Sequence, residues 1–401
     1  MPVMAAALLA DSPTVIHAVP QLEDIYTFNN VLRITGAQVD FDESNNILTI
    51  DPSHVTHLEA PYELVRKMRA SFYMLGALLG RYGRAKVSLP GGCAWGPRPV
   101  DLHLKGLRTF GAEIELDNGY VIGNAPDGKL QGGSFRLDPS SVGATINLLL
   151  ATVRSKGQFK IENAAREPDV VQLCNVLQKM GAQIEGVGTK TLAIDGVDQL
   201  EGVEVQNAPD RIETGTFMIA GVMHPESEIT ITQTRPDELG DFLDTFKNLN
   251  ADTRIDGSKI HVKAPSTLHP ESIETAVYPG FPTDLQAQWT TMMTQAEGAS
   301  SVTDHIYNDR FNHIPELVRL GASITVNGNT ARIQGKTPLQ GATVMSTDLR
   351  ASVSLVLAAM IANGETHVKR IYHLDRGYED LEQKLTNVGA EIQRVQDTEQ
   401  P

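Results

Sequence analysis

Lys179-Met180-Gly181-Ala182 ends a helical pattern of apolar residues and is followed at once by an alternating strand pattern. The same Gly-Ala signal after a helix returns elsewhere, at Gly36, Gly111, Gly321 and Gly389 and, in a degenerate form, at Asn250. A glycine just past the last helical turn can take the left-handed conformation that ends a helix. The six positions lie roughly seventy residues apart, so the chain is predicted to hold six copies of one unit.

Each copy repeats the same order of elements. An apolar helix is followed by a strand, as at residues 158–162, and then by a more polar helix, as at residues 169–179, whose apolar side chains share one face. Two short strands joined by turns such as Asp117-Asn118-Gly119 close the copy. Counting the strand before the first helix, the unit is βαβαββ.

The apolar helices decide the architecture. Those at residues 144–153 and 352–361 are apolar nearly all round and cannot lie on a wet surface. We therefore expect them inside, with the sheets outside them. Three copies in each half predict two α/β domains, residues 1–208 and 209–401, with a boundary near residues 206–210.

The first copy differs from the others because residues 1–10 open almost directly into the apolar helix. The chain is therefore expected to begin inside a repeat, which makes the first repeat truncated at its start. Either an N-terminal strand and turn have been lost, or the recorded start lies downstream of the real one.

Composition limits the class of protein. The 401 residues are 41% hydrophobic and carry a formal charge of -15, which argues against a nucleic-acid or anionic-membrane partner. The two cysteines, Cys93 and Cys174, form no zinc-binding spacing and indicate a reducing compartment. The apolar start has no basic region and is cut short by Asp11. These features predict a soluble cytoplasmic protein.

Residues 88–103, SLPGGCAWGPRPVDLH, form the most unusual loop. An apolar strand runs into Pro90-Gly91-Gly92, and a helix is expected to begin at Pro99 with Asp101 in its first turn. Cys93 lies between them, next to flexible glycines and followed by Arg98. It is either a reactive thiol or a small buried residue in a structural turn.

Arginines recur at loops and at helix entries. Arg69 and Arg350 occupy corresponding entries to the first helix of copies two and six, whereas Arg98, Arg310 and Arg376 lie in loops. Such arginines suit phosphate or carboxylate binding, although each one taken alone could equally be part of a surface ion pair.

Two helix starts add further candidates. Ser141, Val142 and Gly143 offer a hydroxyl and backbone N–H groups, which either cap the helix or bind an anion. Asp284, in Thr283-Asp284-Leu285, is either a helix-start carboxylate or a base.

Several long motifs resemble one family. In this order and spacing, the chain resembles the UDP-N-acetylglucosamine 1-carboxyvinyltransferases, the enolpyruvyl transferases that commit a sugar nucleotide to peptidoglycan. The motifs are PGGCAWGPRPVDLH (90–103), ENAAREPDVV (162–171), PDRIETGTF (209–217), GFPTDLQAQ (280–288), TDLRAS (347–352) and RIYHLDRGYE (370–379). The resemblance implies two inside-out α/β barrels, each of three βαβαββ units.

The resemblance also implies roles for named residues. UDP-N-acetylglucosamine would be held by Arg98, Pro99, Val100, Asp101, Leu102, Ser141, Val142, Gly143, Asp284 and Ile306. Phosphoenolpyruvate would be held by Arg69, Arg98, Arg350 and Arg376. Asp284 would help to remove the proton of the sugar 3-hydroxyl, and Cys93 would deliver a proton to the enolpyruvyl methylene carbon or hold a covalent adduct, as part of a lid. Cys93, Asp284 and Arg376 are thus the implied catalytic residues, and no metal or organic cofactor is expected.

The chain departs from the family pattern in three places. The family carries a Lys-Asn pair before the first helix, and this chain starts after that point; the missing strand belongs to the second domain, whose sheet should have an unpaired edge. Pro139 stands where some members have lysine, and bulky Trp95 lies beside the thiol. The alternatives to an active enzyme of this kind are a silent or weakly active sugar-nucleotide-binding regulator and a phosphoshikimate enolpyruvyl transferase.

Overall fold

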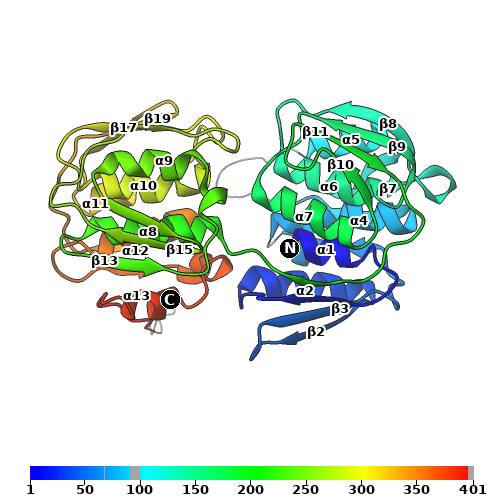
Figure 1. Ribbon diagram of the computed structural model, residues 1–401, viewed down its shortest axis with the longest axis horizontal. Helices are drawn as coiled ribbons and strands as arrows, with labels where there is room; N and C mark the ends of the chain where they lie inside the picture. The colour runs from blue at the N-terminus through cyan, green and yellow to red at the C-terminus, as the bar shows by residue number, and fades with distance from the viewer. Residues whose placement is uncertain (67, 91–99, 396–401) are drawn as a thin grey trace. The chain divides into compact units, whose positions relative to one another are not determined.

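The computed structural model describes residues 1–66, 68–90 and 100–395. The chain divides into two compact units, Met1–Ala208 and Pro209–Pro401 (Figure 1). Each unit is described by itself below.

The first unit is built around three buried helices. They are α1 (Pro2–Ala7), α4 (Tyr73–Tyr82) and α6 (Val142–Thr152), the first helices of copies one, two and three. They pack against one another, and nearly every residue of each is buried, which agrees with their apolar sequences. The remaining helices are α2 (Glu23–Thr35), α3 (Tyr62–Val65), α5 (Asp101–Thr109), α7 (Pro168–Lys179), η1 (Arg69–Phe72) and η2 (Pro126–Gly128).

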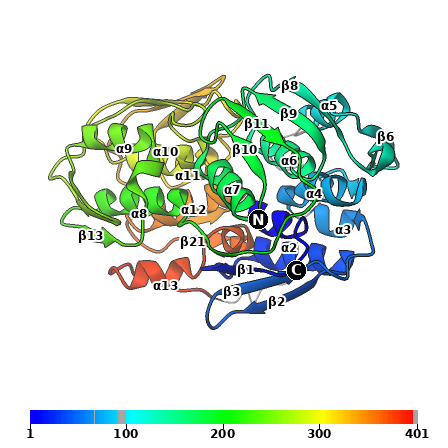
Figure 2. The same ribbon diagram turned by 45° about the vertical axis from the view of Figure 1, so that its right-hand side comes forward.

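Three four-stranded sheets surround these helices, with strand orders β12-β1-β3-β2, β4-β5-β7-β6 and β10-β11-β9-β8 (Figure 2). The strands are β1 (Thr14–His17), β2 (Gln38–Asp42), β3 (Ile47–Asp51), β4 (Glu59–Ala60), β5 (Arg84–Ser88), β6 (Glu113–Asp117), β7 (Tyr120–Asn124), β8 (Gln131–Arg136), β9 (Lys156–Glu162), β10 (Gln183–Glu185), β11 (Thr191–Asp195) and β12 (Glu204–Gln206). Each sheet joins one parallel pair to two antiparallel pairs, as in β8 with β9, β9 with β11 and β11 with β10. The predicted βαβαββ repeat is therefore confirmed. The first unit, Met1–Ala208, is an inside-out α/β barrel of such repeats.

The first sheet is completed by a strand from the far end of the unit. β12 follows copy three in the sequence, yet it pairs in parallel with β1, with Val15 opposite Glu204. His17 Nε2 lies 2.6 Å from Glu204 Oε1 across this pair. β12 thus occupies beside β1 the position that β4 occupies beside β5 and β8 beside β9.

The Gly-Ala signals end helices as predicted. Gly36, Gly111 and Gly181 have φ of 100°, 90° and 109°, which is the left-handed region. Asn250, in the degenerate copy, has φ of 63°. Glycine takes this conformation without a Cβ clash and asparagine tolerates it better than most residues, so the repeat recurs because its backbone turn recurs.

The second unit repeats this plan around α8 (Arg211–Met223), α10 (Gln286–Met293) and α12 (Leu349–Ala359). Its other helices are α9 (Asp241–Phe246), α11 (Ile314–Arg319), α13 (Leu381–Thr386), η3 (Pro236–Leu239), η4 (Lys247–Leu249), η5 (Thr283–Leu285) and η6 (Ile371–Arg376). Its strands are β13 (Glu228–Ile231), β14 (Asp252–Asp256), β15 (Lys259–Lys263), β16 (Ile273–Glu274), β17 (Ser300–Thr303), β18 (Ile324–Asn327), β19 (Thr330–Ile333), β20 (Thr343–Met345) and β21 (His367–Lys369).

The sheets of the second unit are less complete. Among the residues that the structure describes, only β16-β17-β19-β18 has four strands; the other sheets are β13-β15-β14 and β20-β21. Within the described residues, no strand pairs with the outer edge of β13, which is the kind of unpaired edge expected for this domain. β21 ends at Lys369, and Ile371 begins η6.

Two arginines anchor the end of α1. Arg81 donates hydrogen bonds to the carbonyl oxygens of Leu8, at 2.7 Å, and Ala10. Arg154, which is almost fully buried, donates to Leu9 O at 2.6 Å and to the Asp11 carboxylate at 2.9 Å. Positive charge at a helix C-terminus is favourable, so α1 is fixed in the barrel although it is short.

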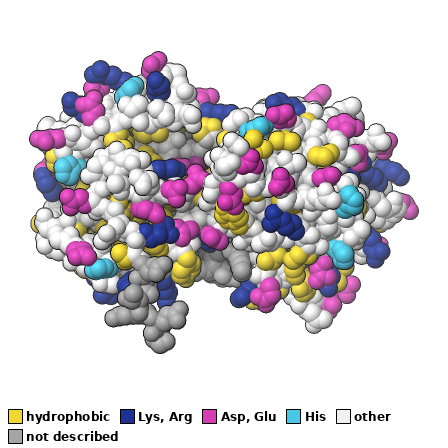
Figure 3. All heavy atoms as spheres, turned by 90° about the horizontal axis from the view of Figure 1, so that it is seen from below, with side chains coloured by type: hydrophobic (Ala, Val, Ile, Leu, Met, Phe, Trp, Pro, Cys, Tyr) yellow, Lys and Arg dark blue, Asp and Glu magenta, His cyan; other side chains and the backbone are white. Residues whose placement is uncertain are grey.

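The surface carries charges of both signs. On the face drawn in Figure 3, Lys and Arg side chains alternate with Asp and Glu side chains over both units. Among the described residues, no helix is long and apolar enough to cross a bilayer.

Helices α4 and α6 approach each other more closely than larger side chains would allow. A Cβ at Gly76 would lie 2.2 Å from the backbone oxygen of Asn147, and one at Gly80 would lie 2.3 Å from that of Leu150. Both obstacles are backbone atoms of a buried helix, which cannot rotate away.

Gly76→Ala should therefore lower the free energy of unfolding by about 3 kcal/mol, the upper end of the usual overpacking cost. Urea midpoints measured by circular dichroism test this. Gly133→Ala is the control, because its Cβ would make only ordinary contacts, with Phe110 Cδ1 at 3.5 Å and Thr109 O at 3.6 Å. Equal midpoints for the two variants would contradict the close contact.

Candidate functional site

Asp284 lies at the centre of a charge cluster in the second unit. It belongs to η5, which leads directly into the buried helix α10. Its Oδ1 atom is 2.7 Å from Arg310 Nη2 and 3.6 Å from Arg350 Nε. The side chains of Arg310 and Arg350 are 7% and 13% exposed, whereas that of Asp284 is 41% exposed. The arginines therefore stand behind a carboxylate that solvent can reach.

The arginines control the ionisation of this carboxylate. Burial alone would raise the pKa of Asp284, but the charges of Arg310, Arg350 and Arg211 outweigh it and hold the pKa below its ordinary value. Burial likewise works against the charged form of Arg350, while the Asp284 carboxylate raises the pKa of that guanidinium above its ordinary value. Asp284 is consequently an anion, and Arg350 a cation, throughout the neutral pH range.

A second, fully buried aspartate supports the cluster from behind. Asp304 accepts hydrogen bonds from Thr275 Oγ1 at 2.8 Å and from Thr283 Oγ1 at 2.6 Å. Thr283 Oγ1 in turn accepts a hydrogen bond from Arg310 Nη1 at 3.0 Å. A continuous chain of hydrogen bonds thus fixes Arg310, which orients Asp284.

Arg350 is held on its other side by Tyr378. Its Nη1 donates to Tyr378 Oη at 3.3 Å, and this hydroxyl lies 2.9 Å from Thr216 Oγ1 of α8. Gln288 of α10 donates to Thr216 Oγ1 at 3.2 Å and to the backbone oxygen of Asp284 at 3.1 Å. All three central helices of the unit therefore contribute to the position of Arg350 and Asp284.

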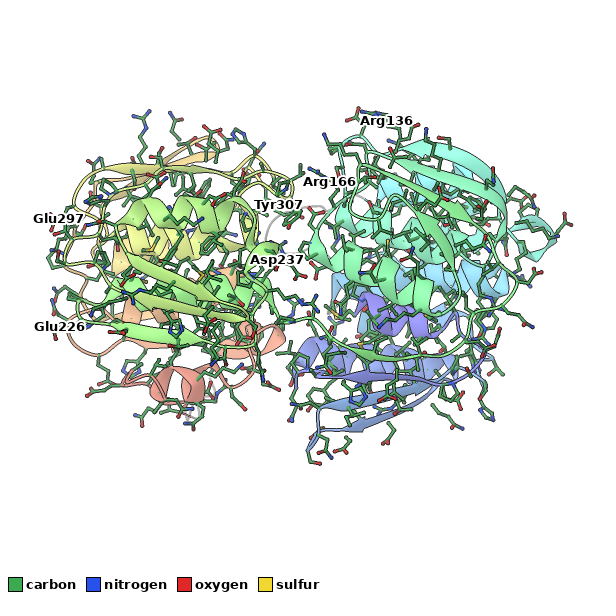
Figure 4. All side chains as sticks on the ribbon, in the orientation of Figure 1. Arg136, Arg166, Glu226, Asp237, Glu297 and Tyr307 are labelled. Atoms are coloured by element: carbon green, nitrogen blue, oxygen red, sulfur yellow. The ribbon has the colours of Figure 1, made fainter. Side chains whose placement is uncertain are left out.

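Two further predicted residues lie around this cluster. Ile306 is partly exposed, and its N–H donates to Asp304 Oδ1 at 2.9 Å, as does that of Tyr307 at 2.8 Å. Figure 4 shows Tyr307 projecting outward from the loop that follows β17. Arg376 is the last residue of η6, which packs against α12, the helix that carries Arg350.

The predicted residues of the first unit gather at two helix starts. Ser141 is the N-cap of α6, and its Oγ accepts a hydrogen bond from Ala144 N at 3.3 Å. Val142 and Gly143 form the first turn of α6, while Asp101 and Leu102 begin α5, which packs against α6. The start of α6 agrees with the prediction, whereas α5 begins at Asp101, two residues after the predicted start at Pro99, and the buried Val100 is its N-cap.

Asp101 makes a hydrogen bond within its own helix, whereas Arg69 acts on α5 through its charge. Asp101 accepts a hydrogen bond from Lys105 Nζ at 2.9 Å within its own helix, and this bond holds the pKa of its carboxyl below the usual range. Arg69 begins η1, and its charge contributes to lowering the pKa of His103 on α5. Arg69 therefore lies within electrostatic reach of the start of α5.

Three predicted residues, Cys93, Arg98 and Pro99, lie outside the described residues. The other cysteine, Cys174, is buried in α7, and burial raises the pKa of its thiol to about 12. Cys174 is therefore chemically inert at neutral pH.

The structure thus joins Asp284 to Arg350 and Arg310 in one unit, and in the other it packs α5, which begins with Asp101 and Leu102, against α6, which begins with Val142 and Gly143. Reasoning from the sequence missed Asp304, Tyr378 and His103. Tyr378 and His103 stand inside quoted motifs, whereas only the polar run Thr303-Asp304 after a strand could have pointed to Asp304. Within the described residues, no group of three or more His, Cys, Asp and Glu side chains is placed to hold a metal ion.

Sequence comparisons identify the relatives of this chain. The family model for EPSP synthase (3-phosphoshikimate 1-carboxyvinyltransferase) matches residues 1–385. The UDP-N-acetylglucosamine 1-carboxyvinyltransferase of Chloroherpeton thalassium is 52% identical over 393 residues, which cover 98% of this chain and 91% of the relative. The protein of the same name from Chlorobium limicola is 49% identical over 395 residues, or 98% of this chain and 92% of the relative.

Solved structures agree. The enolpyruvyl transferase NikO from Streptomyces tendae matches with a TM-score of 0.88 and 28% identity, over 97% of this chain and 92% of its own. EPSP synthase from Acinetobacter baumannii matches with a TM-score of 0.72 and 18% identity, over 96% and 92%, a likeness of fold alone. The chain belongs to the enolpyruvyl transferase family and, within it, to the UDP-N-acetylglucosamine 1-carboxyvinyltransferases.

Proposed function

We propose that this protein transfers the enolpyruvyl group of phosphoenolpyruvate to the 3-hydroxyl of UDP-N-acetylglucosamine and releases phosphate. Identity of about half the residues over nearly the whole length of relatives with this name supports the proposal. The observation that carries it is an ionised, solvent-accessible Asp284 fixed between two arginines. The reaction would serve peptidoglycan synthesis in the cytoplasm, and thereby cell shape and division.

The reaction requires a base and a proton donor on opposite sides of the enolpyruvyl double bond. Asp284 accepts the proton of the sugar hydroxyl as its oxygen bonds to C2 of phosphoenolpyruvate, while Cys93 gives a proton to the methylene carbon. The tetrahedral intermediate then loses phosphate from C2 and a proton from the new methyl group, which restores the double bond. Fosfomycin-type epoxides would inhibit by alkylating the same thiol.

The substrates divide between the residues as the family resemblance suggests. Arg69, Arg98, Arg350 and Arg376 hold phosphoenolpyruvate. Arg98 to Leu102, Ser141 to Gly143 and Ile306 hold the sugar nucleotide. The planar guanidinium groups of arginines bind phosphate and carboxylate through paired hydrogen bonds and neutralise their charge. Both groups are present in phosphoenolpyruvate.

The cluster also suggests how substrate binding increases the basicity of the Asp284 carboxylate. In the free protein, Arg350 and Arg310 hold the pKa of Asp284 low, which makes the carboxylate a poor proton acceptor. An anionic substrate on Arg350 would cancel part of that positive charge, and the pKa of Asp284 would rise. The base would thus gain strength only when phosphoenolpyruvate is bound.

Asp284→Asn should retain nucleotide binding but lower kcat by about 10²- to 10⁴-fold, the usual contribution of a general base. Phosphate release from phosphoenolpyruvate plus UDP-N-acetylglucosamine measures kcat, and calorimetry measures nucleotide binding. Asp256→Asn, at the exposed end of β14, is the control. If the unaltered chain binds the nucleotide but releases no phosphate, it is a silent sugar-nucleotide-binding regulator instead.

Arg310→Gln should move the acid limb of the kcat/KM-pH profile, which reports the free protein, upward by about one pH unit or more, because burial raises the pKa of Asp284 and the chief opposing charge is gone. In the unaltered protein, the ionised form of Asp284 persists below the ordinary aspartate range, so this group should cause no loss of rate between pH 7 and about 5. Arg319→Gln, on the exposed face of α11, should leave the profile unchanged. An acid limb that does not move in Arg310→Gln would refute this control of Asp284.

Thiol-directed epoxides should label Cys93 and spare Cys174, whose thiol is buried and has a pKa of about 12. Cys93→Ser should abolish labelling measured by mass spectrometry, and Cys174→Ser should leave it intact. Equal labelling of both cysteines in the unaltered protein would count against a specially activated Cys93.

A further inference from the structure

Arg394 makes four hydrogen bonds that join two separate segments of the second unit. Its Nη1 and Nη2 atoms donate to the two carboxylate oxygens of Asp375, at 3.0 Å and 2.7 Å. Its Nε and Nη2 atoms donate to the two carboxylate oxygens of Glu382, at 2.8 Å and 3.2 Å. Asp375 belongs to η6 and Glu382 to α13, so one guanidinium pairs with both elements. The chemistry described above uses none of these three residues.

The paired geometry makes this a strong contact for residues near the surface. An arginine that shares two parallel hydrogen bonds with a carboxylate is held more firmly and in a more defined direction than by one bond. The side chain of Arg394 is 40% exposed, whereas those of Asp375 and Glu382 are 28% and 26% exposed. The hydrogen bonds to Asp375 and then to Glu382 raise the pKa of Arg394 above its ordinary value. These three residues are called the Arg394 clamp below.

The Arg394 clamp bridges a turn in the backbone. Asp380, between η6 and α13, has φ of 46°, and Arg370, just before η6, has φ of 58°. Residues other than glycine rarely adopt this left-handed conformation, so the surrounding structure has to hold such turns in place. Arg394 spans the turn at Asp380, because it holds Asp375 on one side of it and Glu382 on the other.

The helix α13 is a firm support for the Arg394 clamp. Its residues Leu381 and Leu385 are buried, and its Lys384 donates from Nζ to Glu213 Oε1 of α8 at 2.7 Å. α13 is therefore anchored to the body of the unit by contacts of its own. The part that depends on Arg394 is the end of η6.

The other side of the same segment is fixed by packing against α12. Leu374 and Tyr378 are buried in one apolar cluster with residues of α12. A Cβ on Gly377 would lie 2.6 Å from a side-chain carbon of α12. Arg376 stands between Asp375 and Gly377 in the sequence. The backbone on either side of Arg376 is thus held from two directions, by α12 and by the Arg394 clamp.

We propose that Arg394 is a positioning residue, which holds Asp375 against α13 and thereby fixes the guanidinium of Arg376 for phosphoenolpyruvate. This inference rests on the proposed function, in which Arg376 holds that substrate. Arg394 itself touches no substrate in this scheme and acts only through the two carboxylates. Its loss should therefore affect phosphoenolpyruvate and spare the sugar nucleotide.

The test compares two substitutions of Arg394 with a matched control. Arg394→Gln removes both ion pairs, whereas Arg394→Lys keeps the charge but lacks the planar group that pairs with both carboxylates. Arg254→Gln is the control, because Arg254 forms a paired contact with Asp252 on β14, at 3.1 Å and 2.7 Å. Phosphate release gives KM for each substrate and kcat. Hydrogen exchange followed by mass spectrometry reports the backbone of residues 371–379.

We expect Arg394→Gln to lower kcat/KM for phosphoenolpyruvate by about 10- to 100-fold, the cost of misplacing a group that positions a substrate. KM for UDP-N-acetylglucosamine should stay within about threefold, and Arg394→Lys should show an intermediate loss. The amides of Gly377 and Tyr378, which donate to Leu374 O at 3.1 Å and 3.0 Å, should exchange faster in Arg394→Gln. Arg254→Gln should change neither the kinetics nor this exchange.

An unchanged kcat/KM for phosphoenolpyruvate in Arg394→Gln, or equal losses for both substrates, would overturn the proposal, since equal losses mark a merely structural arginine. Asp375→Asn has to show the same selective loss, which keeps the test open if Arg394→Gln does not fold. Combining the two substitutions should add little further loss, because both break one contact. If the unaltered chain releases no phosphate, the proposed function fails, and the exchange of Gly377 and Tyr378 decides whether Arg394 fixes this segment.

Discussion

The close contact between α4 and α6 is the constraint on which the first unit depends. Gly76 and Gly80 bring α4 against the backbone of α6 at distances that no side chain would permit. The same approach places Gly76 N against Asn147, and Asn147 against His103. The absence of Cβ atoms in α4 therefore decides where the Asn147 amide lies and, with it, one contact of the buried His103.

In the second unit the main constraint is electrostatic, because a charged carboxylate lies beside two buried arginines. Arg310 and Arg350 would be costly to bury alone, and Asp284 supplies the opposite charge that both require. Arg310 is held by Thr283, which is itself bound to Asp304, and Arg350 is held by Tyr378, so both guanidinium groups are fixed in position. The charges of this cluster are therefore paired and fixed in the free protein.

Much of the fold can be predicted from the sequence, because a backbone turn that recurs in each copy requires the same type of residue at that position. Gly36, Gly111 and Gly181 stand in a left-handed conformation, and helices without a polar face had to be central. Asp284, Arg350 and Ser141 can be singled out as candidates from the sequence because helix starts have recognisable chemistry. Asp304 and Tyr378 were missed because their roles arise from contacts between distant segments, such as Tyr378 with Thr216, which no local pattern contains. The neutral state of His103 likewise depends on burial and on Arg69, and neither can be read from neighbouring residues.

The pairing of β12 with β1, from opposite ends of the first unit's sequence, affects how the chain folds. His17 and Glu204, which meet where β12 joins β1, are separated by 187 residues. During synthesis, the edge of β1 that binds β12 stays unpaired until nearly all of the first unit has emerged from the ribosome. Such long-range closure raises the contact order and slows folding, yet it also makes completion of the barrel depend on all three repeats being present.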